Sequence, residues 1–333
     1  MEVTLLIPGV VPDRPLPHAP RLPALERLLA RADRDAPPAE GREATLCRLF
    51  GWPGGELPVG LLAARGEGLE EGHWLCAAPV HLAPERDRLR LYPPELLELE
   101  PGEAEALAAA LDDHFRDAGL GGLQAPHPLR WYLRLPARAR LSTTPLERAL
   151  HLPVEEALPR GEDAPWWQRL LTEAQMLLHL HQVNRERERG GRPSVNALWV
   201  WGAGVPREAA SGFSGAWGSA PLLRGAAARV GIPVRPLAEG AGGVIARAAA
   251  DGAQLVVWER AAEALARLDT EGWQAALEEL ETRWLAPLTG AVERGRLEAL
   301  VVETGEGLRL RYRRGHRWRL WRRPRALSAG GGE

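Results

Sequence analysis

The stretch from His181 to Gly204 reads HQVNRERERGGRPSVNALWVWGAG, and it shows how this chain is organised. It begins where a long helical pattern of apolar residues ends, and its first half is polar and rich in arginine and glutamate. Residues 196–201 (NALWVW) are then almost continuously apolar, which is typical of a strand buried on both faces. Gly202 and Gly204 end that run. The stretch therefore predicts a helix end, a polar loop and a buried strand, in this order.

Strands and helices alternate through most of the remaining chain. Residues 3–7 (VTLLI) form an apolar run, and residues 22–32 place leucines on one helical stripe. Further buried strands are predicted at 253–259 and 297–304, separated by the mostly helical segment 265–294. This alternation predicts an α/β fold, a doubly wound sheet in a three-layer sandwich with helices on both faces.

Between residues 50 and 135 the pattern changes. Turns rich in glycine and proline are frequent, and short strand-like pieces flank a helical pattern. We predict an inserted α+β lobe at 50–135 within a discontinuous α/β core formed by 1–49 and 136–327. Residues 328–333 (SAGGGE) are predicted to be a disordered tail.

Composition places the chain among ordinary globular proteins. Of its 333 residues, 45% are hydrophobic and 26% are charged, and the formal net charge is -2. The whole protein thus has no positive field that would attract nucleic acid or a membrane, and we expect neither as a partner. Two cysteines and an N-terminal apolar run too short for a signal sequence predict a cytoplasmic protein.

Four segments, taken in order, carry a resemblance to a known family. They are PGVVPDRP (8–15), LPVGLLAARGEGLEEG (57–72), HQVN (181–184) and NALWVWGAG (196–204). Their order resembles that of the archaeal-type cofactor-independent phosphoglycerate mutases, metal enzymes of the alkaline-phosphatase superfamily. With EGHWLCAAPVHL (71–82) and RWYL (130–133), the chain looks still closer to a proteobacterial family labelled regulation-of-pathogenicity-factor (Rpf type) proteins. The resemblance implies the α/β core and the inserted lobe of that superfamily.

The resemblance also implies where metal ligands and a nucleophile belong, and most of them are missing. Pro8 stands where the first aspartate ligand is expected, and residues 17–23 (PHAPRLP) offer no hydroxyl nucleophile. A two-metal phosphoryl-transfer site needs clustered aspartates and histidines. We therefore expect no metal and no other cofactor. Under the alternative of an active enzyme, two Mn or Zn ions would be held by ligands drawn from Asp13, Glu259, Glu263, Glu306 and His316.

Polar residues and glycines near these segments are the candidates for binding a small phosphorylated or anionic ligand. A strand that ends in glycines lets a phosphate approach the backbone closely, and ligands of α/β sheets bind beyond the carboxyl ends of strands. Polar residues beside a buried strand also satisfy backbone groups, so a purely structural interpretation stays open. The candidates are Asp13, Arg14, Asn184, Asn196, Gly202 and Gly204.

An arginine-rich segment lies near the end of the chain. Residues 307–324 (GLRLRYRRGHRWRLWRRP) alternate arginine with apolar residues, which predicts a hairpin turning near 314–316. Arginines on one face would form a positive surface for anions, nucleic acid or a protein partner. A charged edge that prevents sheets from associating is the other interpretation. The arginines in question are Arg309, Arg311, Arg313, Arg317 and Arg319.

These patterns predict a bacterial binding or regulatory protein, a diverged and metal-free relative of the mutases rather than an enzyme. Its partner would be a small anionic ligand or another protein. Two alternatives remain. One is an active phosphoglycerate mutase or phosphatase with rearranged metal ligands. The other is a nucleic-acid or protein-binding module that uses the arginine-rich segment.

Overall fold

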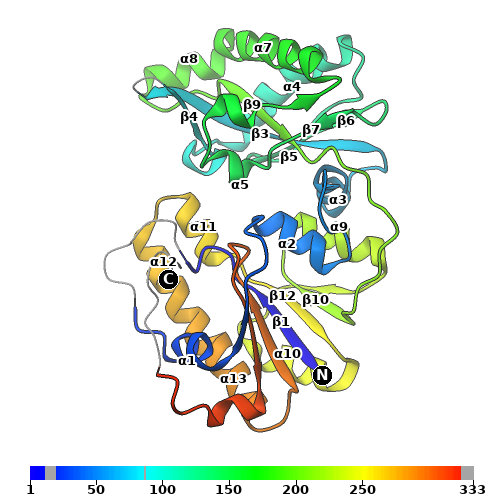
Figure 1. The fold of residues 1–333 in the computed structure, drawn as a ribbon. Helices are drawn as coiled ribbons and strands as arrows, with labels where there is room; N and C mark the ends of the chain where they lie inside the picture. Colours follow the sequence, from blue (N-terminus) through cyan, green and yellow to red (C-terminus); the bar gives the residue numbers. More distant parts are fainter. Residues whose placement is uncertain (12–19, 86–87, 324–333) are drawn as a thin grey trace. The chain divides into compact units, whose positions relative to one another are not determined.

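The structure is a computed structural model, and it describes residues 1–11, 20–85 and 88–323 (Figure 1). The chain divides into two compact units. The first unit comprises Met1–Gly51, Ala210–Leu223 and Ala227–Glu333, and the second comprises Trp52–Ala209 with Arg224–Ala226. The expected disordered tail, 328–333, lies outside the described residues, as do the candidates Asp13 and Arg14.

A mostly parallel sheet forms the centre of the first unit. Its central strands are short, mostly apolar runs that are buried on both faces, as parallel sheets require, whereas the strands at its edges are polar and more exposed. In spatial order they are β11 (Val234–Arg235), β10 (Gly215–Trp217), β12 (Gln254–Val257), β1 (Glu2–Leu6), β13 (Ala299–Glu303), β14 (Arg309–Arg313) and β2 (Asp33–Asp35). The strands from β11 to β13 run parallel, whereas β14 is antiparallel to both β13 and β2.

One face of this sheet packs against a large set of helices. Val3, Leu5 and Val302 on that face share a single hydrophobic core with the helices. These helices are α1 (Pro23–Arg31), α10 (Ala241–Asp251), α11 (Arg260–Ala266), α12 (Thr270–Glu279), the π-helical turn η2 (Leu280–Leu285) and α13 (Ala286–Glu293).

Helices also lie on the opposite face. The chain travels from β10 through α9 (Pro221–Val230) to β11, and then in the other direction through α10 to β12. Because crossovers between parallel strands are right-handed, α9 and α10 belong to opposite faces. Arg48 of α2 (Arg42–Leu49) contacts Glu303, whose side chain points away from the face that Val302 occupies. The predicted α/β fold with helices on both faces is therefore confirmed.

The second unit contains an antiparallel sheet. Its long strand β3 (His73–Glu85) pairs with β4 (Arg88–Tyr92), β6 (Arg130–Leu135) and β9 (Ala197–Trp201), and β5 (Gly122–His127) pairs with β6. The helices α4 (Pro101–Asp117) and α7 (Ala164–Leu180) contribute to one apolar core with this sheet. The smaller elements are α3 (Val59–Gly66), η1 (Pro94–Leu96), β7 (Leu141–Ser142), α5 (Leu146–Ala149), α6 (Val154–Ala157), β8 (Arg160–Gly161) and α8 (Gln182–Arg189).

The predicted end of the inserted lobe at residue 135 needs correction. The second unit continues to Ala209, because β9 pairs with Cys76–Val80 of β3 and α7 packs on the same core as α4. Residues 136–209, which were predicted to belong to the α/β core, are part of the second unit. The buried strand in NALWVW is present, but it joins the antiparallel sheet.

The predicted hairpin within 307–324 is also wrong. β14 pairs with β13, with Ala299 opposite Arg313, and the segment Arg314–Trp318 is the 3-10 helix η3. Leu310 and Tyr312 extend the apolar core beside β13, whereas Trp318 and Leu320 are exposed. Among the described helices, none has both the length and the apolar composition that crossing a bilayer requires.

Candidate functional site

The carboxyl ends of β1, β12 and β13 bring together the residues that follow each strand. In open α/β sheets this edge is the usual position of a ligand. Gly9 follows β1, Glu259 follows β12, and Glu303 and Glu306 lie at and beyond the end of β13. The edge therefore collects three carboxylates, one after β12 and two at the end of β13, which makes it the place to look for a metal site.

Glu303 is 1% exposed, and its charge is compensated by two arginines. Arg48 of α2 donates to one carboxylate oxygen of Glu303, and the Arg309 Nε lies 3.3 Å from the other. Burying a carboxylate is costly unless it is paired, and these two guanidinium groups offset that cost for Glu303.

Glu259 and Glu306 are likewise bound by the protein itself. The Arg42 Nη1 donates to the Glu259 Oε1 at 2.9 Å, and the Gly9 amide donates to the Glu306 Oε1 at 3.1 Å. Gly9 has φ +75°, and a Cβ at this position would lie 2.7 Å from the backbone of Ala262. Glycine is thus required for β1 to turn tightly enough to present its amide to Glu306.

The alternative metal-ligand set is only partly assembled. Glu259 and Glu306 reach the same edge, and Glu263 lies one helical turn beyond Glu259 on α11. His316 follows β14, whose last residue pairs with Ala299 at the start of β13, about 13 Å from the Glu303 end at a rise of about 3.3 Å per residue. The structure therefore places His316 at the other end of the sheet.

These donors do not fit a pair of divalent ions. In the part of the chain that the structure describes, no three His, Cys, Asp or Glu side chains lie close enough together to hold one metal ion. Two divalent ions need several carboxylate or imidazole ligands free to bind them. At this edge the described carboxylates already accept hydrogen bonds from arginine or from the backbone.

A different carboxylate occupies the glycine turn that follows β9. The Ala203 amide donates to the Glu56 Oε1 at 3.1 Å, and the Gly202 amide donates to the Thr143 Oγ1 at 3.0 Å. The Thr143 amide in turn donates to the Glu56 Oε2 at 2.9 Å. Glu56 thus takes from this turn a hydrogen bond of the kind that a bound anion would accept. Neither Glu56 nor Thr143 was a candidate from the sequence.

The same contacts explain why glycines occupy this turn. A Cβ on Gly202, which has φ +81°, would lie 2.6 Å from the Gly60 nitrogen. A Cβ on Gly204 would lie 2.1 Å from the Glu56 carbonyl oxygen. Both glycines allow residues 56–60 to pack directly on the end of β9. Their proposed part in ligand binding stays a prediction.

Both candidate asparagines bond to the backbone. The Asn184 side chain donates to the carbonyls of Leu178 and Val195 and accepts from the Val195 amide, at 2.7 to 2.8 Å. The Asn196 side chain donates to the Leu82 carbonyl and accepts from the Leu82 amide. These contacts match the structural interpretation of both residues, and a contact with a ligand stays a prediction.

Arg187 is a structurally important residue that sequence reasoning missed. It is fully buried, and it donates to the carbonyls of Pro193 and Leu97 and, at 2.5 Å, to the Glu103 carboxylate. Burial tends to raise the pKa of Glu103, but the Glu100 amide and the guanidinium groups of Arg187 and Arg192 outweigh it and lower that pKa. Its position one helical turn after Asn184 was the available signal, because the two then share a helix face.

The arginines predicted to form a positive surface are largely engaged within the protein. Arg309 pairs with Glu303, Arg311 with Glu2, and both Arg313 and Arg319 with Asp33. The Arg317 Nη1 donates to the Glu293 carbonyl at 3.0 Å. Four of these five arginines are therefore held in ion pairs within the protein, and Arg317 is held by a hydrogen bond to a backbone carbonyl. Its role as an anion-binding surface stays a prediction.

His316 has a structural position beside Asp33. Its Nε2 lies 3.4 Å from the Asp33 Oδ2, and its Nδ1 accepts from the Arg313 amide at 3.3 Å. Burial lowers the pKa of His316, and the nearby Arg319 lowers it further despite the Asp33 carboxylate. This arrangement fastens η3 to β2.

The cysteines lack the properties of a nucleophile. Cys47 and Cys76 are both buried and form no disulfide. Burial, with a contribution from Glu43, raises the pKa of Cys47 to about 12, so its thiol is protonated at neutral pH.

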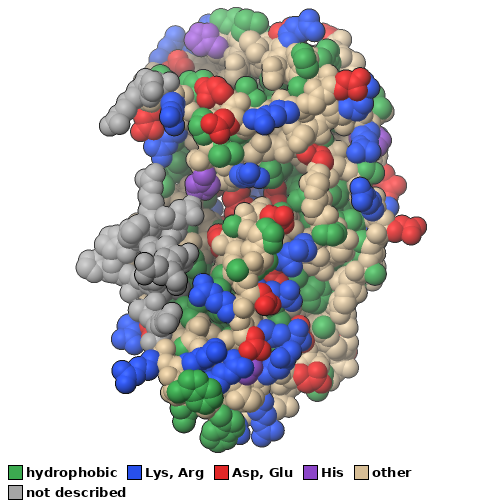
Figure 2. All heavy atoms as spheres, in the orientation of Figure 1, with side chains coloured by type: hydrophobic (Ala, Val, Ile, Leu, Met, Phe, Trp, Pro, Cys, Tyr) green, Lys and Arg blue, Asp and Glu red, His purple; other side chains and the backbone are tan. Residues whose placement is uncertain are grey.

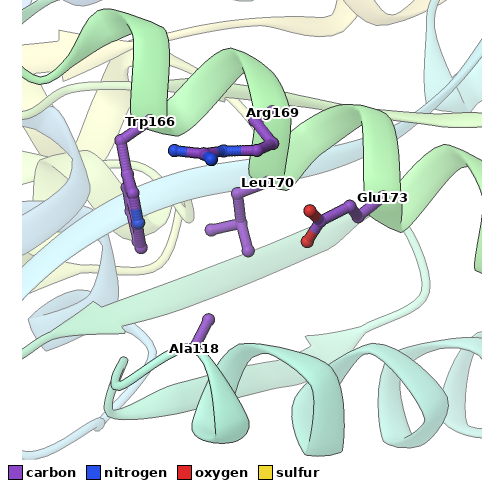
Figure 3. A pocket seen from close by; sticks show the side chains of 5 residues that line it. All are labelled: Ala118, Trp166, Arg169, Leu170 and Glu173. Atoms are coloured by element: carbon purple, nitrogen blue, oxygen red, sulfur yellow. The ribbon is translucent and has the colours of Figure 1, made fainter.

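The described surface is hollowed in each of the two units. One hollow, of about 300 Å³, lies between the end of α4 and one side of α7, and Figure 3 shows its lining: Ala118, Trp166, Arg169, Leu170 and Glu173. The other, of about 570 Å³, lies at the start of α10, where Gly240, Gly242 and Arg283 are among its lining residues. No candidate from the sequence lines either hollow.

Comparison with known proteins gives short sequence matches to one group. No known protein-family profile matches the chain. The 2,3-bisphosphoglycerate-independent phosphoglycerate mutase of Methanosarcina mazei is 37% identical over 51 residues, which cover 15% of this chain and 13% of that protein. The protein of the same name from Methanothrix thermoacetophila is 38% identical over 61 residues, covering 18% of this chain and 16% of its own length. These local matches support a distant relation to the archaeal cofactor-independent phosphoglycerate mutases.

Two solved structures align over most of the chain at low similarity. The cofactor-independent phosphoglycerate mutase of Thermoplasma acidophilum aligns with 94% of this chain and 90% of its own, with 19% identity and a TM-score of 0.40. A protein of Pyrococcus horikoshii aligns with 93% of this chain and 86% of its own, with 16% identity and a TM-score of 0.49.

Proposed function

We propose that this chain is a metal-free relative of the cofactor-independent phosphoglycerate mutases, with a binding or regulatory role in place of catalysis. The local sequence matches support the relation. The alternative of an active mutase or phosphatase with rearranged ligands would need the carboxylates at the edge of the first unit's sheet to be free for metal ions.

The observation that carries this proposal is the pairing of two of those carboxylates, Glu259 and Glu303, with arginine. Arg48 and Arg309 compensate the charge of Glu303, and Arg42 compensates that of Glu259. A divalent ion would have to displace guanidinium groups that belong to the same chain and are therefore always present. Arginine also keeps its proton at any physiological pH, so this compensation does not fluctuate.

The expected ligand is a small phosphorylated or other anionic molecule. The matched relatives are named for phosphoglycerate, and Arg42 and Arg48 lie at the sheet edge where α/β folds bind ligands. Guanidinium groups bind phosphate and carboxylate oxygens in pairs, which makes them suitable for this class of ligand. The cytoplasmic location of the protein, which the sequence predicts, stays part of this proposal.

Metal content and turnover test the proposal directly. We expect protein purified without chelator to contain no stoichiometric Mn or Zn by elemental analysis. We also expect no conversion of 3- to 2-phosphoglycerate in a coupled assay with added Mn²⁺. The Methanosarcina mazei enzyme under the same conditions serves as the positive control. Metal-dependent turnover, or one bound metal ion per chain, would overturn the proposal.

Thermal unfolding with candidate ligands tests the binding role. We expect 3-phosphoglycerate to raise the melting temperature of the wild-type chain and to have a smaller effect on Arg42→Gln. Sulfate at the same ionic strength controls for a general salt effect. An equal shift for both proteins would remove this edge as the binding position.

A further inference from the structure

Three large apolar side chains protrude together at the end of the described chain. Trp318, Leu320 and Trp321 are 64%, 65% and 76% exposed, and all three lie within four consecutive residues. Figure 2 shows hydrophobic side chains projecting beside basic ones in the region where Figure 1 draws the end of this segment. Single exposed apolar residues are common on protein surfaces, whereas a contiguous group of them marks an interaction surface.

The charge around these residues is strongly positive. Residues 307–323 contain eight arginines and no carboxylate. Four of these arginines pair with Glu2, Asp33 or Glu303. The other four have no carboxylate partner among the described residues: Arg314, Arg317, Arg322 and Arg323. The net charge of -2 for the whole chain therefore conceals a local patch of uncompensated positive charge.

We propose that this Trp–Arg tip, formed by Arg314, Arg317, Trp318, Leu320, Trp321, Arg322 and Arg323, binds the surface of an anionic phospholipid bilayer. Indole rings favour the headgroup level of a bilayer, where their apolar body and polar N–H are both accommodated. Leucine beside them inserts among the acyl chains, and arginine binds the lipid phosphates. Such surface binding needs no membrane-spanning helix and does not depend on the proposed function.

The shape of the tip favours a lipid surface over nucleic acid. Single-stranded nucleic acid binds through bases stacked on open aromatic faces. The Arg317 guanidinium lies 4.7 Å from the centroid of the Trp318 ring and covers one of its faces. The three apolar side chains of the tip are each more than half exposed, so they project into the solvent. A bilayer surface adapts to projecting side chains, whereas a folded partner would need matching pockets.

The first unit holds the tip on a well-anchored base. The Arg319 Nη1 donates to the Arg31 carbonyl and to the Asp33 Oδ1, each at 2.8 Å. The Arg31 Nη1 donates in return to the Arg317 carbonyl at 3.1 Å. These contacts fix the backbone of residues 317–319 to α1 and β2. Binding therefore need not pay the entropic cost of ordering this part of the chain.

Vesicle co-sedimentation of the full chain tests the proposal. We expect the wild type to sediment with phosphatidylcholine vesicles that contain phosphatidylglycerol, and much less with phosphatidylcholine alone. Arg314→Gln, Arg322→Gln and Arg323→Gln should each weaken partitioning about five-fold, and together roughly 100-fold. Trp318→Ala with Trp321→Ala should also abolish most of the sedimentation at unchanged charge.

Trp166→Ala with Arg169→Gln is the matched control, because these residues are an exposed tryptophan and arginine on α7 of the second unit. This control should bind vesicles like the wild type, and circular dichroism should show that all variants are folded. Sedimentation of the tip variants equal to that of the wild type would overturn the proposal. Failure of the wild type to sediment with anionic vesicles would also overturn it, even if the wild type bound duplex DNA or a protein.

Discussion

Arg187 shows how much one buried charge contributes to the second unit. A methionine at this position would fill similar space, but it would leave two carbonyls and part of the Glu103 carboxylate without a partner. Removing one member of a buried ion pair costs about 3 kcal/mol or more. We expect Arg187→Met to lower the free energy of unfolding by about 3 kcal/mol in urea titrations.

Arg192→Met is the matched control for this change, because Arg192 binds the same carboxylate but is 41% exposed. Its loss should be below about 1 kcal/mol, as is usual for exposed ion pairs. Equal losses for the two variants would show that burial does not set the contribution of Arg187.

The pair formed by Arg48 and Glu303 predicts a strong coupling between two residues far apart in sequence. Arg48→Met leaves the buried Glu303 carboxylate with Arg309 as its remaining ion-pair partner, which should lower the free energy of unfolding by about 2 kcal/mol. Glu303→Gln removes the charge that Arg48 compensates. In the Arg48→Met background, Glu303→Gln should therefore lower the free energy of unfolding much less than it does in the wild type. A double-mutant cycle measured by urea unfolding checks this, and strict additivity would contradict it.

The turn after β9 predicts a steric effect of a single methyl group. Gly204→Ala would place a Cβ 2.1 Å from the Glu56 carbonyl oxygen, so residues 56–60 would have to move away from the strand. We expect a loss of about 2 kcal/mol or more in the free energy of unfolding. Gly212→Ala, where no atom lies within 4 Å of the new Cβ, is the control and should change stability by less than about 0.5 kcal/mol.

The junction of β2 with η3 predicts a pH dependence. The hydrogen bond from Arg319 lowers the pKa of Asp33, and His316 and Arg313 add to this although burial opposes it. A lowered pKa means that the stability from Asp33 is fully present above its unfolded pKa, about 4, and is lost as the pH falls through the folded value. Asp33→Asn should therefore be less stable than the wild type at neutral pH, and the difference should shrink below about pH 4.

Urea titrations across this pH range check the Asp33 prediction. Asp35→Asn is the control, because Asp35 lies on the same strand and forms no ion pair with any described residue. A stability difference for Asp33→Asn that stays constant down to acid pH would contradict the assignment.

Predictability from sequence differs between elements. The strands β1, β12 and β13 were predicted at their places, because continuous apolar runs are a local signal. β9 was predicted as a strand but assigned to the wrong sheet, since a buried run does not show which partner covers it. Likewise, the arginines of β14 were visible in the sequence, whereas their partners Glu2 and Asp33 lie about 300 positions away along the chain.

Only part of the candidate site could be read from the sequence. The missing aspartates and histidines could be noted by resemblance, but the pairing of Arg48 with Glu303 required the folded structure. Glu56 was not found because nothing local connects it with Thr143 or Ala203, which lie 87 and 147 residues further along.

For the protein as a whole, the lack of a three-ligand cluster among the described residues predicts thermal stability that does not depend on metal. A metal ion bound only by the folded state, at 100 times its Kd, adds about 2.7 kcal/mol. That would raise the melting temperature by several degrees. We expect calorimetric melting temperatures to agree within about one degree in EDTA, in buffer and with added Mn²⁺. A rise with Mn²⁺ that EDTA reverses would contradict this.

Glu56 has a consequence for any free anion that meets the glycine turn after β9. Because the carboxylate is tethered to the same polypeptide, its effective concentration at the Ala203 amide is on the order of millimolar or higher. A metabolite phosphate would compete successfully only if it brought contacts that Glu56 does not make. Glu56 thus acts as an intramolecular competitor at this turn, and only a ligand that displaces its carboxylate from the Ala203 amide would bind there.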